Sequence, residues 1–101
     1  MGTWKRVADA AEAFSVRGFE VGGERVAVFR TPEGIYALDD ICSHEYALLS
    51  EGEVWDGEVY CPKHGSRFAL ATGAVTGFPA TDPVRTWKVK AEEGGIWVAL
   101  P

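Results

Sequence analysis

The stretch from Cys42 to His64 reads CSHEYALLSEGEVWDGEVYCPKH, and it contains every cysteine and histidine of the 101-residue chain. One residue separates Cys42 from His44. Two residues separate Cys61 from His64, and sixteen lie between the two pairs. Thiolate and imidazole groups divided evenly between two short loops are typical ligands of a metal centre.

The first pair lies in a segment that suits extended backbone. Residues two apart in extended chain point to the same side, so Cys42 and His44 can face a common site while Ser43 turns outward. Further along, Asp56–Gly57 lies between two short alternating segments and predicts a type I′ hairpin turn. Such a hairpin would bring the second pair of donors back beside the first.

The second pair needs a turn, because Cys61 and His64 are three residues apart. Pro62 restricts the backbone and Gly65 allows unusual backbone angles, which suits a tight loop between strands. The sequence therefore predicts that two loops present four side chains to one centre.

Outside these loops the chain has the pattern of an antiparallel β protein. Turn residues at Gly22–Gly23, Thr31–Gly34 and Gly94–Gly95 separate apolar runs. Only Ala8–Phe14 could form a helical turn, which would be marginal unless packed. Nine strands are predicted, at Trp4–Ala8, Phe14–Val21, Arg25–Arg30, Ile35–Leu38, Glu53–Trp55, Glu58–Tyr60, Arg67–Leu70, Val84–Ala91 and Ile96–Leu100.

The strand pattern divides the chain into a base and an insertion. Residues 1 to about 38 and about 84 to 101 hold the long strands, whereas about 39 to 83 hold all four donors and most irregular turns. We therefore expect one all-β domain, residues 1–101, with an antiparallel sandwich or barrel as its base and a small lobe that carries the metal centre.

Composition narrows the possible surroundings and partners. The net charge of -5 and the pI of about 4.9 argue against nucleic acid, which needs a basic face. No signal peptide and no run of 18 apolar residues is present, so we expect a cytoplasmic protein without a membrane segment. A Cys42–Cys61 disulfide is an alternative, but a reducing cytoplasm opposes it.

The two donor loops and their neighbours resemble the Rieske [2Fe-2S] proteins. The resemblance rests on C-x-H followed by C-x-x-H, on Leu49–Gly52 (LSEG), on Cys61–Phe68 (CPKHGSRF) and on Gly77–Pro83 (GFPATDP). It implies one [2Fe-2S] cluster. By the same resemblance, Cys42 and Cys61 bind the inner, buried iron of the cluster through their thiolates. His44 and His64 bind the outer iron through their imidazoles.

The resemblance also assigns roles around the cluster. The proline segment, with Pro79, would cover one side, and Gly65 would shape the second loop. Ser66 stands where high-potential members have a serine donor, but Phe68 stands where they have a tyrosine, and the two extra bridging cysteines are missing. Potentials of Rieske centres span roughly -150 to +300 mV, and hydrogen bonds to sulfur set the position within that range. We expect a potential below that of respiratory members.

Chains of this length with this pattern resemble the ferredoxin components of bacterial multicomponent aromatic-ring dioxygenases. The resemblance implies a one-electron carrier in aromatic hydrocarbon catabolism, not an enzyme and without a small-molecule substrate. It would dock transiently, as a monomer, to a flavin-dependent NAD(P)H reductase and to a terminal oxygenase. Two alternatives stay open: the small Rieske subunit of a nitrite reductase, and a structural Cys2His2 zinc domain.

Several residues near the donors allow two interpretations. Lys63 and Arg67 could contact an acidic partner or be solvated loop charges. Tyr46 and Phe78 could belong to a docking face or could pack beneath the loops. Most of the four tryptophans are expected in the core.

Overall fold

The computed structural model describes residues 3–44 and 46–99, which form ten strands and one short 3₁₀ helix. The elements are β1 Lys5–Asp9, β2 Val16–Val21, β3 Glu24–Thr31, β4 Gly34–Asp39, η1 Leu49–Glu51, β5 Glu53–Trp55, β6 Glu58–Tyr60, β7 Arg67–Ala69, β8 Val75–Gly77, β9 Thr86–Glu92 and β10 Gly95–Ala99. No helix in this part of the chain is long and apolar enough to span a membrane.

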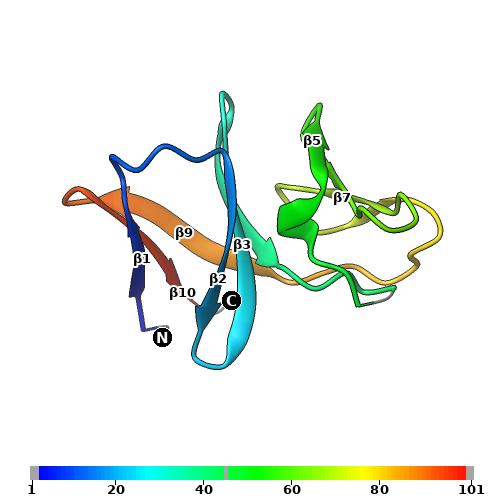
Figure 1. Ribbon diagram of the computed structural model, residues 1–101, viewed down its shortest axis with the longest axis horizontal. Coiled ribbons are helices and arrows are strands. Elements are labelled where there is room, and N and C mark those ends of the chain that lie inside the picture. The colour runs from blue at the N-terminus through cyan, green and yellow to red at the C-terminus, as the bar shows by residue number, and fades with distance from the viewer. Residues whose placement is uncertain (1–2, 45, 100–101) are drawn as a thin grey trace.

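The strands form two antiparallel sheets. The six-stranded sheet has the order β1-β10-β9-β4-β3-β2, and the four-stranded sheet has the order β5-β6-β7-β8. The outer strands β1 and β2 contact each other, so the larger sheet nearly closes into a barrel. Figure 1 shows the smaller sheet beside this barrel, with the loops that bear the four donors. The predicted all-β fold, with a barrel-like sheet, is confirmed.

Strand β3 explains how the two sheets share apolar side chains. Its central residues Val26 to Phe29 are all fully buried, because alternate side chains enter two different cores. Val26 and Val28 belong to the barrel core. Ala27 and Phe29 belong to a second core between the sheets.

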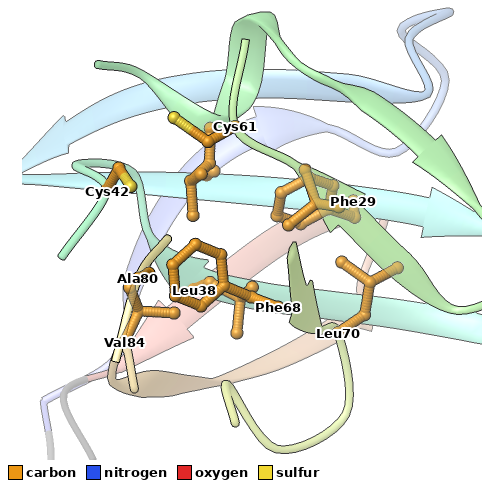
Figure 2. Packing of buried hydrophobic residues seen from close by; sticks show 11 residues of the cluster. Phe29, Leu38, Cys42, Cys61, Phe68, Leu70, Ala80 and Val84 are labelled. Carbon is orange, nitrogen blue, oxygen red and sulfur yellow. The ribbon is translucent and has the colours of Figure 1, made fainter. Parts of the chain in front are cut away.

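The second core lies beneath the donor loops. It includes both cysteines together with buried apolar side chains from both sheets and from the segments between strands, among them Phe29, Leu38, Leu49, Val59, Phe68, Leu70, Ala80 and Val84. In Figure 2 the side chains of Leu38 and Phe68 lie at the centre of this cluster, and Cys42 and Cys61 lie at one side of it. The larger sheet therefore provides the apolar floor on which the donor loops rest.

Hairpin turns follow the chemistry expected of glycine. Both residues of Gly22–Gly23 have positive φ, 59° and 83°, and so do Asp56 and Gly57, at 52° and 78°, as a type I′ turn requires. The last hairpin turns one residue earlier than predicted, at Glu93–Gly94. Gly95 pairs with Glu92 inside the sheet instead.

All nine predicted strands form, with ends that differ by up to two residues. Leu100, the last residue of the final predicted strand, lies outside the described residues. Strand β8 was not predicted, because it has only three residues and contains a single apolar side chain. It pairs with β7 across an irregular register.

The segment Ala8–Phe14, where a marginal helical turn was possible, forms no helix. Strand β1 continues through Asp9, which pairs with Gly95. After it, the carbonyl oxygens of Ala10 and Glu12 accept hydrogen bonds from the Arg30 guanidinium of β3, at 3.0 and 2.7 Å. These tertiary bonds satisfy the carbonyl groups that a helical turn would use.

Candidate metal centre

The first donor loop leaves β4 and is held by its own backbone. The Cys42 N–H donates to the Ala47 carbonyl at 2.9 Å, and the Leu49 N–H donates to the Asp40 carbonyl at 2.6 Å. Within the loop the Cys42 thiol is buried, whereas His44 is exposed. The loop therefore presents one donor inward and one at the surface.

The second donor loop connects β6 to β7. The Cys61 N–H donates to the Ser66 carbonyl at 2.7 Å, and the Gly65 N–H donates to the Cys61 carbonyl at 3.1 Å. Gly65 has a φ of 78°, so the turn expected here is confirmed. Cys61 is buried and His64 is exposed, as in the first loop.

The two thiols lie close together in the second core. The pKa of the Cys61 thiol is raised above its ordinary value, chiefly by burial and also by the adjacent Cys42 thiol. The backbone N–H groups of Lys63 and His64 lower this pKa and so offset part of the increase. Both cysteines are free.

The two imidazoles form the outer pair. The ring centroids of His44 and His64 are 6.3 Å apart, with 70° between the ring planes. Within residues 3–44 and 46–99, no three His, Cys, Asp or Glu side chains gather as they would around one ion. A two-iron centre needs a ligand pair for each iron, and a buried thiol pair with an exposed imidazole pair fits that donor set.

Two serines hold the proline segment, residues 77–83, against the donor loops. The Ser66 hydroxyl is buried and accepts a hydrogen bond from the Ala80 N–H at 2.9 Å. The exposed Ser43 hydroxyl donates to the Asp82 carbonyl. Because Ser66 uses a lone pair for this contact, its own O–H can still donate to a neighbouring sulfur. Pro79 is half-buried in the same segment.

Phe68 lies fully buried in the second core, opposite Val59 on β6. It has no hydroxyl, so it fills this position only with apolar surface. Its neighbour Arg67 is half-buried, lies over the Tyr60 ring at 5.8 Å and pairs with Glu58 at 3.7 Å. Arg67 is therefore engaged within the smaller sheet, whereas Lys63 is exposed.

Two aromatic side chains, one in the first donor loop and one in the proline segment, are exposed. Tyr46 is 73% exposed and Phe78 is 83% exposed, so the interpretation that they pack beneath the loops is wrong. Among the tryptophans only Trp87 is buried, and Trp55 is 72% exposed. Trp55 alternates with Val54 in a short strand, and it is Val54 that packs on the core.

Sequence reasoning missed two acids that lie immediately before the first donor loop. Asp39 accepts hydrogen bonds from Arg85 Nε and from the Trp87 indole N–H, both at 2.9 Å. Burial would raise the pKa of Asp39, but these hydrogen bonds and the charge of Arg85 outweigh burial and lower it. Asp40 is fully buried and binds Arg25 and Ser50. The sequence signal was the pair of acids itself, inside the otherwise apolar run Ala37–Cys42 (ALDDIC).

Comparison with known proteins agrees with the geometry. Residues 3–88 match the Rieske [2Fe-2S] domain family. The chain is 42% identical over 77 residues to the anthranilate 1,2-dioxygenase ferredoxin subunit of Burkholderia cepacia, covering 76% of this chain and 71% of that one.

Solved structures give the same result. The ferredoxin of carbazole 1,9a-dioxygenase from Nocardioides aromaticivorans IC177 is similar with a TM-score of 0.90 and 35% identity, covering 98% of this chain and 99% of that one. A second similar structure is the ferredoxin in a complex of reduced oxygenase and oxidized ferredoxin of carbazole 1,9a-dioxygenase. Its TM-score is 0.86 and its identity 34%, and the match covers 94% of this chain and 100% of that one.

The small subunit of a putative NADPH nitrite reductase is also similar, with a TM-score of 0.80 and 26% identity over 95% of this chain and 97% of that one. The dioxygenase ferredoxins described above match with higher TM-scores and identities. The family match identifies the cofactor as one Rieske-type [2Fe-2S] cluster, so the single-zinc alternative is wrong. The chain belongs to the Rieske [2Fe-2S] family, and within it to the ferredoxins that carry electrons in aromatic-ring dioxygenase systems without being catalytic subunits.

Proposed function

We propose that this ferredoxin takes single electrons from a flavin-dependent NAD(P)H reductase and delivers them to the terminal oxygenase of an aromatic-ring-hydroxylating dioxygenase. The observation that carries the proposal is the pair of imidazoles at the surface, 6.3 Å apart, above a pair of buried thiols. The complex of a related ferredoxin with its oxygenase supports the same partner class.

Four side chains of the two loops would hold the cluster. Cys42 and Cys61 are suited to the inner iron because both are buried and adjacent, and His44 and His64 to the outer iron because both are exposed. The bound cluster supplies a site that accepts and releases one electron. The surrounding chain keeps water from the thiolates and leaves the imidazoles accessible to a partner.

The docking face would consist of the exposed side chains around the two histidines, namely Tyr46, Lys63 and Phe78. Aromatic side chains give contact area with little loss of conformational entropy, and one cation gives orientation toward an acidic patch. A carrier must dissociate after each transfer, so a small interface of this kind suits its task.

We further propose that the carrier acts as a monomer in the cytoplasm, where nicotinamide-dependent reductases operate. Residues 39–83, which carry the smaller sheet and both donor loops, would form the cluster-binding lobe on the base. The exposed ligand loops of a single copy suffice for both docking events.

Anaerobic electron transfer tests the proposal. The purified protein should contain iron and acid-labile sulfide in equal amounts and absorb visible light. Reduced by a dioxygenase reductase and mixed with an oxidised terminal oxygenase, it should pass on one electron per chain. A cluster-loaded protein that exchanges no electrons with any such oxygenase would refute the proposal.

A further inference from the structure

Asp40 is a buried charge beside the first donor loop. Its carboxylate accepts hydrogen bonds from Arg25 Nη2 at 2.7 Å, from the Ser50 N–H at 2.7 Å and from the Ser50 hydroxyl at 3.0 Å. All three contacts are donated to the carboxylate, as an ionised acid requires. Asp40 is fully buried, whereas the Arg25 side chain is 33% exposed.

The pair lies close to the donors by chain connectivity. Asp40 precedes Cys42 by two residues, so their Cα atoms are at most about 7 Å apart. The Asp40 N–H donates to the Arg25 carbonyl at 3.1 Å, which joins the loop to β3. The ion pair is therefore fixed at the start of the first donor loop, with its carboxylate buried.

The backbone of β2 closes over this pair at Gly18. A Cβ atom added at Gly18 would lie 2.4 Å from Arg25 Nη2, 2.5 Å from Asp40 Oδ2 and 2.9 Å from Ser50 Oγ. The space above the ion pair is thus filled by main chain. Charges shielded from water act over longer distances than charges at the surface, because screening is weaker.

We propose that the Arg25–Asp40 pair tunes the reduction potential of the centre held by the two donor loops; the inference rests on the proposed ligand assignment. Reduction adds one negative charge to the centre. A nearby cation favours that addition and a nearby anion opposes it. In the intact pair these two effects on the potential nearly cancel, whereas either charge alone shifts the potential. The pair thereby keeps a buried acid next to the ligands without lowering the potential.

The two single substitutions then have opposite effects. Asp40→Asn leaves Arg25 uncompensated and raises the midpoint potential, and Arg25→Gln leaves Asp40 uncompensated and lowers it. Two unit charges about 12 Å apart, at an effective dielectric constant of about 20, interact strongly enough to change an equilibrium roughly tenfold, which sets the scale of the expected shift. For one electron this is about 59 mV. The shift in Asp40→Asn should be the smaller, because the partly exposed Arg25 can turn toward water.

The experiment is redox titration of the cluster-loaded protein and its variants at low ionic strength, with iron content and visible spectrum recorded for each. Arg25→Lys keeps the charge and loses part of the hydrogen-bond geometry, so its potential should stay near that of the wild type. The Arg25→Gln, Asp40→Asn double variant should also return toward the wild type. Arg85→Gln is the matched control, because Arg85 pairs with the neighbouring Asp39 and its own side chain is 52% exposed. The shift in Arg85→Gln should be less than half that in Arg25→Gln.

Shifts of the same sign in the two single variants, or an equal shift in Arg25→Lys and Arg25→Gln, would overturn the inference in favour of a structural role. If Arg25→Gln does not fold, the other two variants still test the inference. Asp40→Asn should shift the potential, and Arg25→Lys should not. Loaded variants with equal potentials overturn this inference alone. A wild-type protein that binds no cluster overturns the proposed ligand assignment and this inference with it.

Discussion

Ser66→Ala removes a buried hydroxyl that accepts a hydrogen bond from the Ala80 N–H at 2.9 Å. Ala80 is itself fully buried, so its amide would find no water in place of the lost oxygen. Leaving a buried donor unsatisfied costs about 1–3 kcal/mol. We expect the free energy of unfolding to fall by that amount.

Ser43→Ala is the matched control, because Ser43 also bonds the proline segment, through the Asp82 carbonyl, but is exposed. Water can replace its hydroxyl, so the change should stay within about 0.5 kcal/mol. Anaerobic urea unfolding of the loaded protein, followed by far-ultraviolet circular dichroism, compares the two variants at constant m-value. A Ser66→Ala variant no less stable than Ser43→Ala would refute the reasoning.

Three further outcomes are expected. The lowered pKa of Asp39 means that its stabilising contribution is complete above its ordinary pKa of about 3.9 and is lost as the pH falls through the lower folded value. Between about pH 5 and pH 2, unfolding free energy should therefore decline less in Asp39→Asn than in the wild type, and parallel declines would contradict this. Tyr46→Ser and Phe78→Ser should slow electron transfer to the oxygenase without moving the midpoint potential; unchanged stopped-flow rates would remove both from the docking face. Gly52→Ala would place a Cβ 1.9 Å from the Tyr60 carbonyl oxygen, so the thermal unfolding midpoint of this variant should fall by several degrees. An unchanged midpoint would show that the backbone shifts to make room at little cost in free energy.

Local sequence pattern was sufficient for the donor loops and for most hairpins. The spacing of Cys61, His64 and Gly65 requires a turn whatever the rest of the fold is. Asp56–Gly57 likewise specifies a hairpin turn from its two residues alone. The glycine pair at residues 94–95 was less informative, because either Glu93–Gly94 or Gly94–Gly95 can form a two-residue turn. Register with β9 decided between them.

Features that depend on distant partners were not predictable. Arg25 and Asp40 are fifteen residues apart and meet only because β3 and the first donor loop pack together. Strand β8 needs β7 beside it before its backbone has a partner. Trp55 has a large apolar ring, yet the alternation of its strand directs Val54 to the core.

The division of β3 between two cores has a consequence for engineering. Ala27 and Phe29 lie beneath the donor loops, while Val26 and Val28 fill the barrel from the same strand. A segment of residues 39–83 transplanted to another scaffold would leave that floor behind and expose the apolar side of the cysteines. Barrel and donor loops should accordingly melt together as one cooperative unit, and a recipient scaffold would have to reproduce this strand before it could hold the loops closed.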